Sequence, residues 1–154
     1  MADPANRDFV AALDAVNARA DGQPGFIWRL VGDGGDATDV RAFDDPDTLV
    51  NLSVWTDADA LRAFVYGDAL HRAIMMRRRE WFDRIETYLA LWWIPVGVTP
   101  TPEDGRARLE HLARHGPTPH AFGFATLCAA PPSRPDESDA DRIAVRAARA
   151  MARR

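Results

Sequence analysis

The stretch that decides the fold is "TLVNLSVW", residues 48–55, because an apolar residue stands at every second position from Val50 to Val54. Successive side chains of a β-strand point to opposite faces of the sheet. The alternation therefore predicts a strand with one purely apolar face and one face that is polar and aromatic. The apolar face holds Val50, Leu52 and Val54, and the other face holds Asn51, Ser53 and Trp55.

The flanking sequence predicts three further strands and three helices. The strands are expected at 25–31 ("GFIWRLV"), 87–95 ("TYLALWWIP") and 120–128 ("HAFGFATLC"), where aromatic and β-branched residues gather between turn residues. The helices are expected at 3–22, at 57–84 with a break near Gly67, and at 101–116. Thr101 suits the N-cap of the last helix and Gly116 its end.

The C-terminal part has a different composition. Residues 129–139, "AAPPSRPDESD", read as a proline-rich linker. The stretch 138–154 is predicted to be a helix capped by Ser138, with arginines in its last turn. We therefore divide the chain into a domain at 1–128 and a linker with a helical appendage at 129–154.

This order of elements predicts an α+β fold, a ferredoxin-like antiparallel sheet with helices on one face. The other face would then expose aromatic residues such as Trp28 or Trp93. Exposed apolar faces of that size are uncommon on monomers. We therefore expect a homodimer that forms through the sheet.

Composition excludes several classes of protein. The net charge of −4 argues against a nucleic-acid binder, which needs a dominant basic face. No stretch approaches the roughly 20 apolar residues of a membrane span, so no membrane partner is expected. Cys128 is the only cysteine, which precludes an internal disulfide and favours the cytoplasm. The Ala/Arg/Asp-rich composition is typical of a bacterial protein with a GC-rich genome.

Three segments resemble a known family: "FVAALDAVNARADGQPGFIWRL", "LVNLSVWTDADALRAFVYGDALHRAIMMRRREWF" and "YLALWWIPVGVTPTPEDGRARLEHLARHGPTPHAFGF". Together they resemble the bacterial DUF3291 family over roughly residues 3–126. That family is similar to the dimeric α/β-barrel superfamily, which includes the antibiotic-biosynthesis monooxygenases. The resemblance implies a dimeric α/β-barrel type of fold and a cofactor-independent reaction on a small molecule.

The chain departs from that superfamily in two respects. Such domains usually open with a strand that is central to the sheet, whereas here the first helix is predicted almost at Met1. Either the given start is late, or another segment fills this gap, such as residues 120–128 or a strand from a partner subunit. The haem-degrading members carry a tryptophan and a histidine where this sequence has Phe64 and Ile74. We therefore expect no cofactor, and no specific complex with haemin.

The segment "LHRAIMMRRREWF", residues 70–82, supplies the candidate catalytic groups. At about 100° per residue, His71, Arg78 and Trp81 share one helical stripe. In one interpretation His71 is a proton acceptor and Arg78 binds a carboxylate or enolate oxygen. In the other, His71 is a core residue, and the arginine stems cover apolar surface while their heads pair with neighbouring acids.

The sheet would supply the second wall of this pocket. We assign catalytic roles to His71, Arg78 and Asn51, and substrate-binding roles to five further residues: Ser53, Trp55, Trp81, Tyr88 and Trp92. An aromatic-lined cavity with a few convergent polar groups is the usual form of a small-molecule site. The alternative is that Asn51 and Ser53 face the barrel side and only hydrogen-bond across strands.

Other chemistry finds less support. "GDGGD", residues 32–36, lacks the lysine of a phosphate-binding P-loop. His111 and His115 are one helical turn apart, but no metal-binding pattern accompanies them, so no metal is expected. The predicted function is a cofactor-independent enzyme, monooxygenase-like or isomerase/cyclase-like, on an aromatic or polyketide-like substrate. The alternative is a ligand-binding or haem-carrying protein without catalysis.

Overall fold

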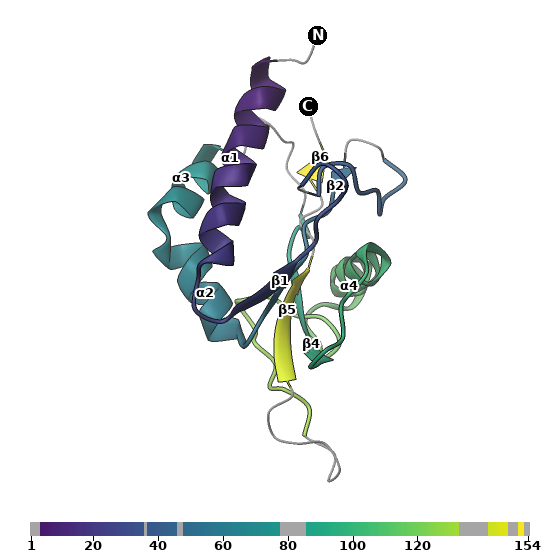
Figure 1. Ribbon diagram of the computed structural model, residues 1–154. Coiled ribbons are helices and arrows are strands. Elements are labelled where there is room, and N and C mark those ends of the chain that lie inside the picture. The colour runs from purple at the N-terminus through teal and green to yellow at the C-terminus, as the bar shows by residue number, and fades with distance from the viewer. Residues whose placement is uncertain are drawn as a thin grey trace.

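The computed structural model describes residues 4–35, 37–45, 48–77, 86–132, 142–147 and 151–152. Within these residues four helices pack around a small antiparallel sheet, which confirms the predicted α+β fold (Figure 1). The helices are α1 (Pro4–Asp21), α2 (Ala58–Gly67), α3 (Ala69–Arg77) and α4 (Pro102–His115). The strands are β1 (Phe26–Arg29), β2 (Thr48–Leu49), β3 (Ser53–Trp55), β4 (Ala90–Pro95), β5 (Arg142–Ala147) and β6 (Met151–Ala152).

The helix ends follow local signals in the sequence. The Asp57 side chain accepts a hydrogen bond from the Ala60 backbone at the start of α2. Thr101 and Asp104 form a reciprocal capping box at the start of α4. Gly116 ends that helix with a φ of 71°, a conformation that favours glycine. The predicted break near Gly67 is confirmed, because Asp68 separates α2 from α3.

The strand order of the main sheet is β1-β3-β5-β4, and every neighbouring pair is antiparallel. β5 comes from the C-terminal end of the chain and lies between β3 and β4. The structure therefore corrects the predicted helix at 138–154, since residues 142–147 form a strand there. β6 pairs with β2 in a separate two-stranded sheet.

β5 takes the place of the opening strand that the sequence lacks before its first helix. It occupies a central position in the sheet, with the backbone of β3 on one side and that of β4 on the other. Residues 120–128, the alternative from the sequence, lie instead at the outer edge of β4. There Leu91 and Phe122 exchange two backbone hydrogen bonds of 2.7 and 2.9 Å.

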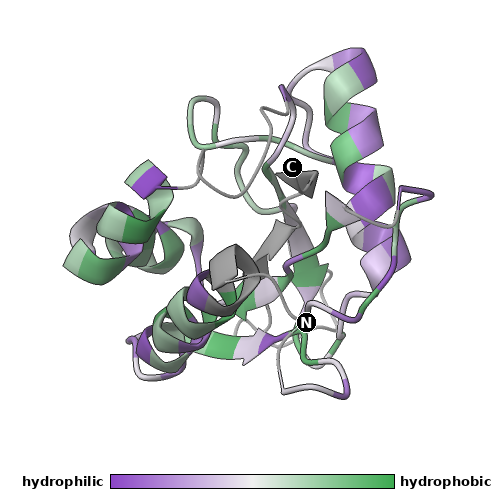
Figure 2. Ribbon diagram, turned by 90° about the horizontal axis from the view of Figure 1, so that it is seen from above, coloured by the Kyte–Doolittle hydropathy of each residue, from purple (hydrophilic) through white to green (hydrophobic). Residues whose placement is uncertain are grey.

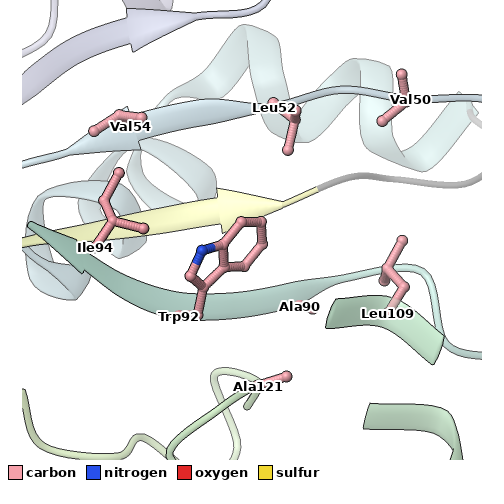
Figure 3. Close-up of a cluster of buried hydrophobic side chains, with 8 residues drawn as sticks. All are labelled: Val50, Leu52, Val54, Ala90, Trp92, Ile94, Leu109 and Ala121. Atoms are coloured by element: carbon pink, nitrogen blue, oxygen red, sulfur yellow. The ribbon is translucent and has the colours of Figure 1, made fainter. Parts of the chain in front are cut away.

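Hydrophobic clusters lie on both faces of the sheet. On one face, Leu61 and Phe64 of α2 pack with Trp55 and with Ala20 of α1. On the other, Leu109 of α4 packs with residues of the strands and their flanks: Val50, Leu52, Val54, Ala90, Trp92, Ile94 and Ala121 (Figure 3). Seen from above, the strands lie between α4 and the other helices, and every helix carries both hydrophobic and hydrophilic bands (Figure 2).

The sequence predicts that one face of the sheet carries no helix, and the position of α4 corrects this prediction. α1, α2 and α3 lie on one side of the sheet, as predicted, but α4 covers the opposite side (Figure 1). Trp92 on that side is 1% exposed within the single chain. Trp28 and Trp93, the residues that motivated the predicted dimer, are each partly buried and pack against the clusters on the two faces. No helix in the described part of the chain is long and apolar enough to cross a membrane.

Candidate functional site

His71 is positioned by the junction between α2 and α3. Asp68, the residue between the two helices, accepts a 2.8 Å hydrogen bond from the His71 backbone N–H through its Oδ1. This bond satisfies one of the backbone donors that the first turn of a helix leaves without a partner. The other carboxylate oxygen lies 3.8 Å from Nε of Arg19 in α1. Asp68 thus links the first turn of α3 to α1.

The imidazole ring of His71 is buried and oriented. Its exposed fraction is 4%, and its Nδ1 lies 3.1 Å from the backbone oxygen of Val65 in α2. A carbonyl oxygen only accepts hydrogen bonds, so Nδ1 carries the hydrogen. In the neutral ring the basic nitrogen is then Nε2.

His71 stands at one end of a row of buried side chains that continues through Phe64 and Trp55 to Ser53. The His71 and Phe64 rings are 5.0 Å apart between centroids, and Phe64 stacks on Trp55 at 5.4 Å. The indole Nε1 of Trp55 donates a 2.9 Å hydrogen bond to Oγ of Ser53. This set, which we call the Ser53–His71 row, has an imidazole at one end, a hydroxyl at the other and aromatic surface between them.

The sheet register separates Trp92 from that row. Val145 of β5 is the register partner of both Val54 and Trp92, whereas Ala144 is the partner of both Trp55 and Trp93. Residues directly opposite one another in a sheet share a face. Trp92 therefore lies on the Val54 face with α4, and the prediction that it lines one pocket with Trp55 is wrong.

The remaining predicted site residues do not join the row either. Asn51 is exposed, and Tyr88 is exposed and precedes β4. Arg78 and Trp81 lie outside the described residues, just beyond the end of α3 at Arg77. Of the predicted set, the structure thus brings together Ser53, Trp55 and His71. Phe64, which links them, was not predicted as a site residue, although its spacing from Leu61 and His71 suits one buried helical stripe.

The family comparison agrees with the resemblance seen in the sequence. The model described as "Domain of unknown function (DUF3291)" matches residues 1–138. The chain belongs to the DUF3291 family. No curated protein and no solved structure matches it. The matched region of this DUF3291 chain ends before β5, so its central strand lies beyond the residues that the family model covers.

A second group of polar side chains lies on the α4 side of the sheet. The ring of His111 is 4.7 Å from that of His115 and 4.6 Å from that of His120, between centroids. Nε2 of His111 also lies 2.9 Å from Oγ1 of Thr118. Within the described ranges, no three His, Cys, Asp or Glu side chains are arranged to hold a metal ion.

Sequence reasoning considered His111 and His115 only as a possible metal pair. It missed Arg108 and His120, whose side chains meet at a distance of 2.8 Å. The only local signal was the density of histidines in "RLEHLARHGPTPH", residues 108–120.

Proposed function

We propose that this protein is a small-molecule enzyme that works without a bound cofactor, in which His71 removes a proton from an acidic carbon of an aromatic or polyketide-like substrate. The proton moves to Nε2 of His71, and the electron pair left on carbon delocalises into an adjacent carbonyl group as an enolate. The enolate then rearranges, or reacts with dioxygen to give a ketone and water. Such a reaction places the protein in secondary metabolism, and the single cysteine favours a cytoplasmic location.

The observation that carries this proposal is the contact between Nδ1 of His71 and the backbone oxygen of Val65. A general base must present one defined nitrogen in one direction. A hydrogen bond from Nδ1 to a main-chain carbonyl is a common way to fix both the tautomer and the ring orientation of a histidine. Burial of the ring to 4% exposure further limits its motion.

The aromatic part of the Ser53–His71 row supports the substrate class. Trp55 and Phe64 stack on each other next to the imidazole, and aromatic surface of this kind favours flat, apolar ligands. Oγ of Ser53 is the polar group at the far end, where it already accepts the Trp55 hydrogen bond. Arg78 and Trp81, which follow α3, stay predicted members of the same site.

The test uses 9-anthrone as a carbon acid whose deprotonation and oxidation can be followed separately. Under nitrogen in heavy water, NMR measures deuterium incorporation at its acidic carbon, which reports proton removal alone. In air, oxygen uptake and anthraquinone absorbance report the whole reaction. We expect the wild-type protein to accelerate the exchange.

The variants His71→Asn and His71→Ala separate catalysis from folding. An asparagine amide can still donate to the Val65 carbonyl, but it cannot act as a base. Both variants should lose about 10² or more of the exchange rate, while His71→Asn keeps a near-native melting temperature. His115→Asn is the matched control, because it removes an exposed histidine on α4 and should change neither quantity. Exchange by His71→Asn at the wild-type rate would contradict the proposal.

Binding without catalysis is the second candidate function. It is favoured by the aromatic row beside His71, in which Phe64 stacks on Trp55 at 5.4 Å between ring centroids and lies 5.0 Å from the imidazole. In that case anthrone should change the protein's tryptophan fluorescence, with no deuterium exchange above the His71→Asn level. A haem-carrying version lacks support, because Phe64 occupies the tryptophan position of the haem-degrading relatives and stacks on Trp55.

Homodimerisation remains a prediction, now without the bare sheet face that motivated it. α4 and the segment with Val40 and Phe43 cover that face within one chain. Light scattering at micromolar concentration tests the association. A mass of twice 17.1 kDa would support the dimer, and its interface would then lie on a surface other than the covered sheet face.

A further inference from the structure

Arg108 in α4 has its guanidinium held over an aromatic ring. Its Cζ lies 5.4 Å from the centroid of the Trp92 ring, and Trp92 itself is buried in the core on that face of the sheet. Stacking of a guanidinium on an indole is favourable and restricts the plane of the cation. The Arg108 head group is thus held against the buried core on this face of the sheet.

His120 fixes the same guanidinium from a second direction. Nη1 of Arg108 donates to the backbone oxygen of His120 at 2.6 Å and lies 2.8 Å from Nδ1 of the same residue. A guanidinium has donors only, so Nδ1 must be the acceptor, and the neutral His120 ring carries its hydrogen on Nε2. Both hydrogens of Nη1 are therefore used by one residue.

The opposite edge of the guanidinium, formed by Nε and Nη2, has no protein partner among the residues that the structure describes. Within those residues no carboxylate lies within ion-pair distance of Arg108. The other arginines of α4 differ, because Arg106 pairs with Asp44 and Glu110, and Arg114 pairs with Glu110. Burial lowers the pKa of Arg108, with Asp104 acting in the opposite direction.

We propose that the Nε–Nη2 edge of Arg108 is a binding site for the carboxylate group of a small molecule. The two parallel N–H groups on this edge match the two oxygens of a carboxylate and can bind it through two hydrogen bonds. The contacts of this guanidinium with Trp92 and His120 fix the edge in the ligand-free protein, which lowers the entropy lost on binding. Arg108 is half-buried and forms no ion pair with a carboxylate of the described residues, so its positive charge favours the binding of an anion.

The neighbouring groups favour the same ligand chemistry. The described surroundings contain three imidazoles, in which the ring of His111 lies 4.7 Å from that of His115 and 4.6 Å from that of His120, between centroids. These rings are neutral or positive, so they do not repel a carboxylate. The site lies on the α4 face of the sheet, opposite the Ser53–His71 row, and it stands independently of the proposed reaction.

The test titrates the full chain with sodium benzoate and, separately, with benzamide, its uncharged analogue of the same shape. NMR follows the Nε–H resonance of Arg108, which is assigned by its absence in Arg108→Lys. Benzoate should shift this resonance saturably in the millimolar range, and benzamide should not. Inorganic phosphate at the same ionic strength distinguishes a general anion effect from carboxylate recognition.

Arg108→Lys keeps the positive charge and removes the two parallel N–H donors, so benzoate affinity should fall about 10-fold or more. Arg114→Lys is the matched control on the same helix and should change it less than about 2-fold. His120→Ala changes an exposed residue and removes the Nδ1 contact with Nη1 while the backbone contact remains, so affinity should fall several-fold, but less than in Arg108→Lys, with folding intact. The proposal is overturned by unchanged affinity in both Arg108→Lys and His120→Ala, by equal binding of benzamide or phosphate, or by no saturable shift with benzoate.

Discussion

Nδ1 of His71 lies 3.1 Å from the backbone oxygen of Val65, across the break that separates α3 from α2. The break itself is made by Asp68, whose carboxylate accepts the His71 backbone N–H. The same short segment therefore starts a helix and aims an imidazole at the preceding one. Changes at Asp68 should affect both the stability of the helix pair and the orientation of the ring.

Asp68→Ala should lower the free energy of unfolding by about 1 kcal/mol, the usual cost of losing a side-chain cap at a helix start. Urea unfolding measures the loss. Asp68→Asn keeps an oxygen that can accept the His71 N–H, so it should retain most of the stability. Equal losses in the two variants would show that the charge opposite Arg19, and not the cap, provides the stabilisation.

Leu52→Ala should destabilise the protein by roughly 3 to 5 kcal/mol, because it leaves a cavity where a fully buried side chain packs between the strands and α4. Thermal and urea unfolding both report this change. Leu127→Ala, at a position 41% exposed, is the control and should cost well under 1 kcal/mol. A small effect at Leu52 would be inconsistent with the core on the α4 face.

The stability of the protein should decrease as the pH falls below about 6.5, in part through His120. Burial is the largest cause of the lowered pKa of His120, followed by the charge of Arg108 and by His111. The unfolded chain therefore binds a proton at a higher pH than the folded one, and acid favours unfolding between the two pKa values. Protonation of Nδ1 would also remove the acceptor for Arg108.

The contribution of His120 is isolated by comparing urea unfolding of wild type and His120→Asn over about pH 5 to 7.5. The variant should show a shallower loss of stability in acid. Above pH 7 its pH dependence should match that of the wild type. Identical acid slopes for the two proteins would exclude His120 as a source of the effect.

The central position of β5 can be tested with a disulfide between Ala90 and Ala147, which face each other in the register of β4 and β5. Ala90→Cys with Ala147→Cys, in a Cys128→Ser background, should form an intramolecular disulfide on mild oxidation. Mass spectrometry and a non-reducing gel detect it. Failure of the pair to cross-link would favour the helical appendage that the sequence predicted for this segment.

The C-terminal strand shows how local and long-range preferences can differ. Alanine and arginine favour helices, and the stretch 138–154 has acids early and arginines late, so it reads as a helix. The alternation of β-branched Ile143 and Val145 with other residues was the contrary signal. Pairing with β3 and β4 on both sides gives this segment a partner for its backbone groups that no local pattern can reveal.

The candidate site was predictable only in part. His71 and Trp55 could be selected from the sequence, because burial and face follow from helical and strand spacing. Trp92 was assigned to the wrong wall because its face relative to Trp55 depends on the register through β5. The contact between Arg108 and Trp92 joins residues 16 positions apart on different elements, so no local spacing could predict it.

Local spacing and capping residues were enough to determine the helices at 4–21, 58–77 and 102–115 and the two faces of residues 50–55, because each depends on neighbours in the sequence. The tertiary structure decided which segment fills the centre of the sheet, that α4 covers its second face, and which nitrogen of His71 is basic. The first two features rest on hydrogen bonds and packing between residues far apart in the chain, such as β5 with β4 and Leu109 with Trp92, and the third rests on the contact of His71 with Val65 across the break between α2 and α3. These tertiary contacts stabilise the protein only after the helices and strands have packed together, so no local stretch of sequence encodes them.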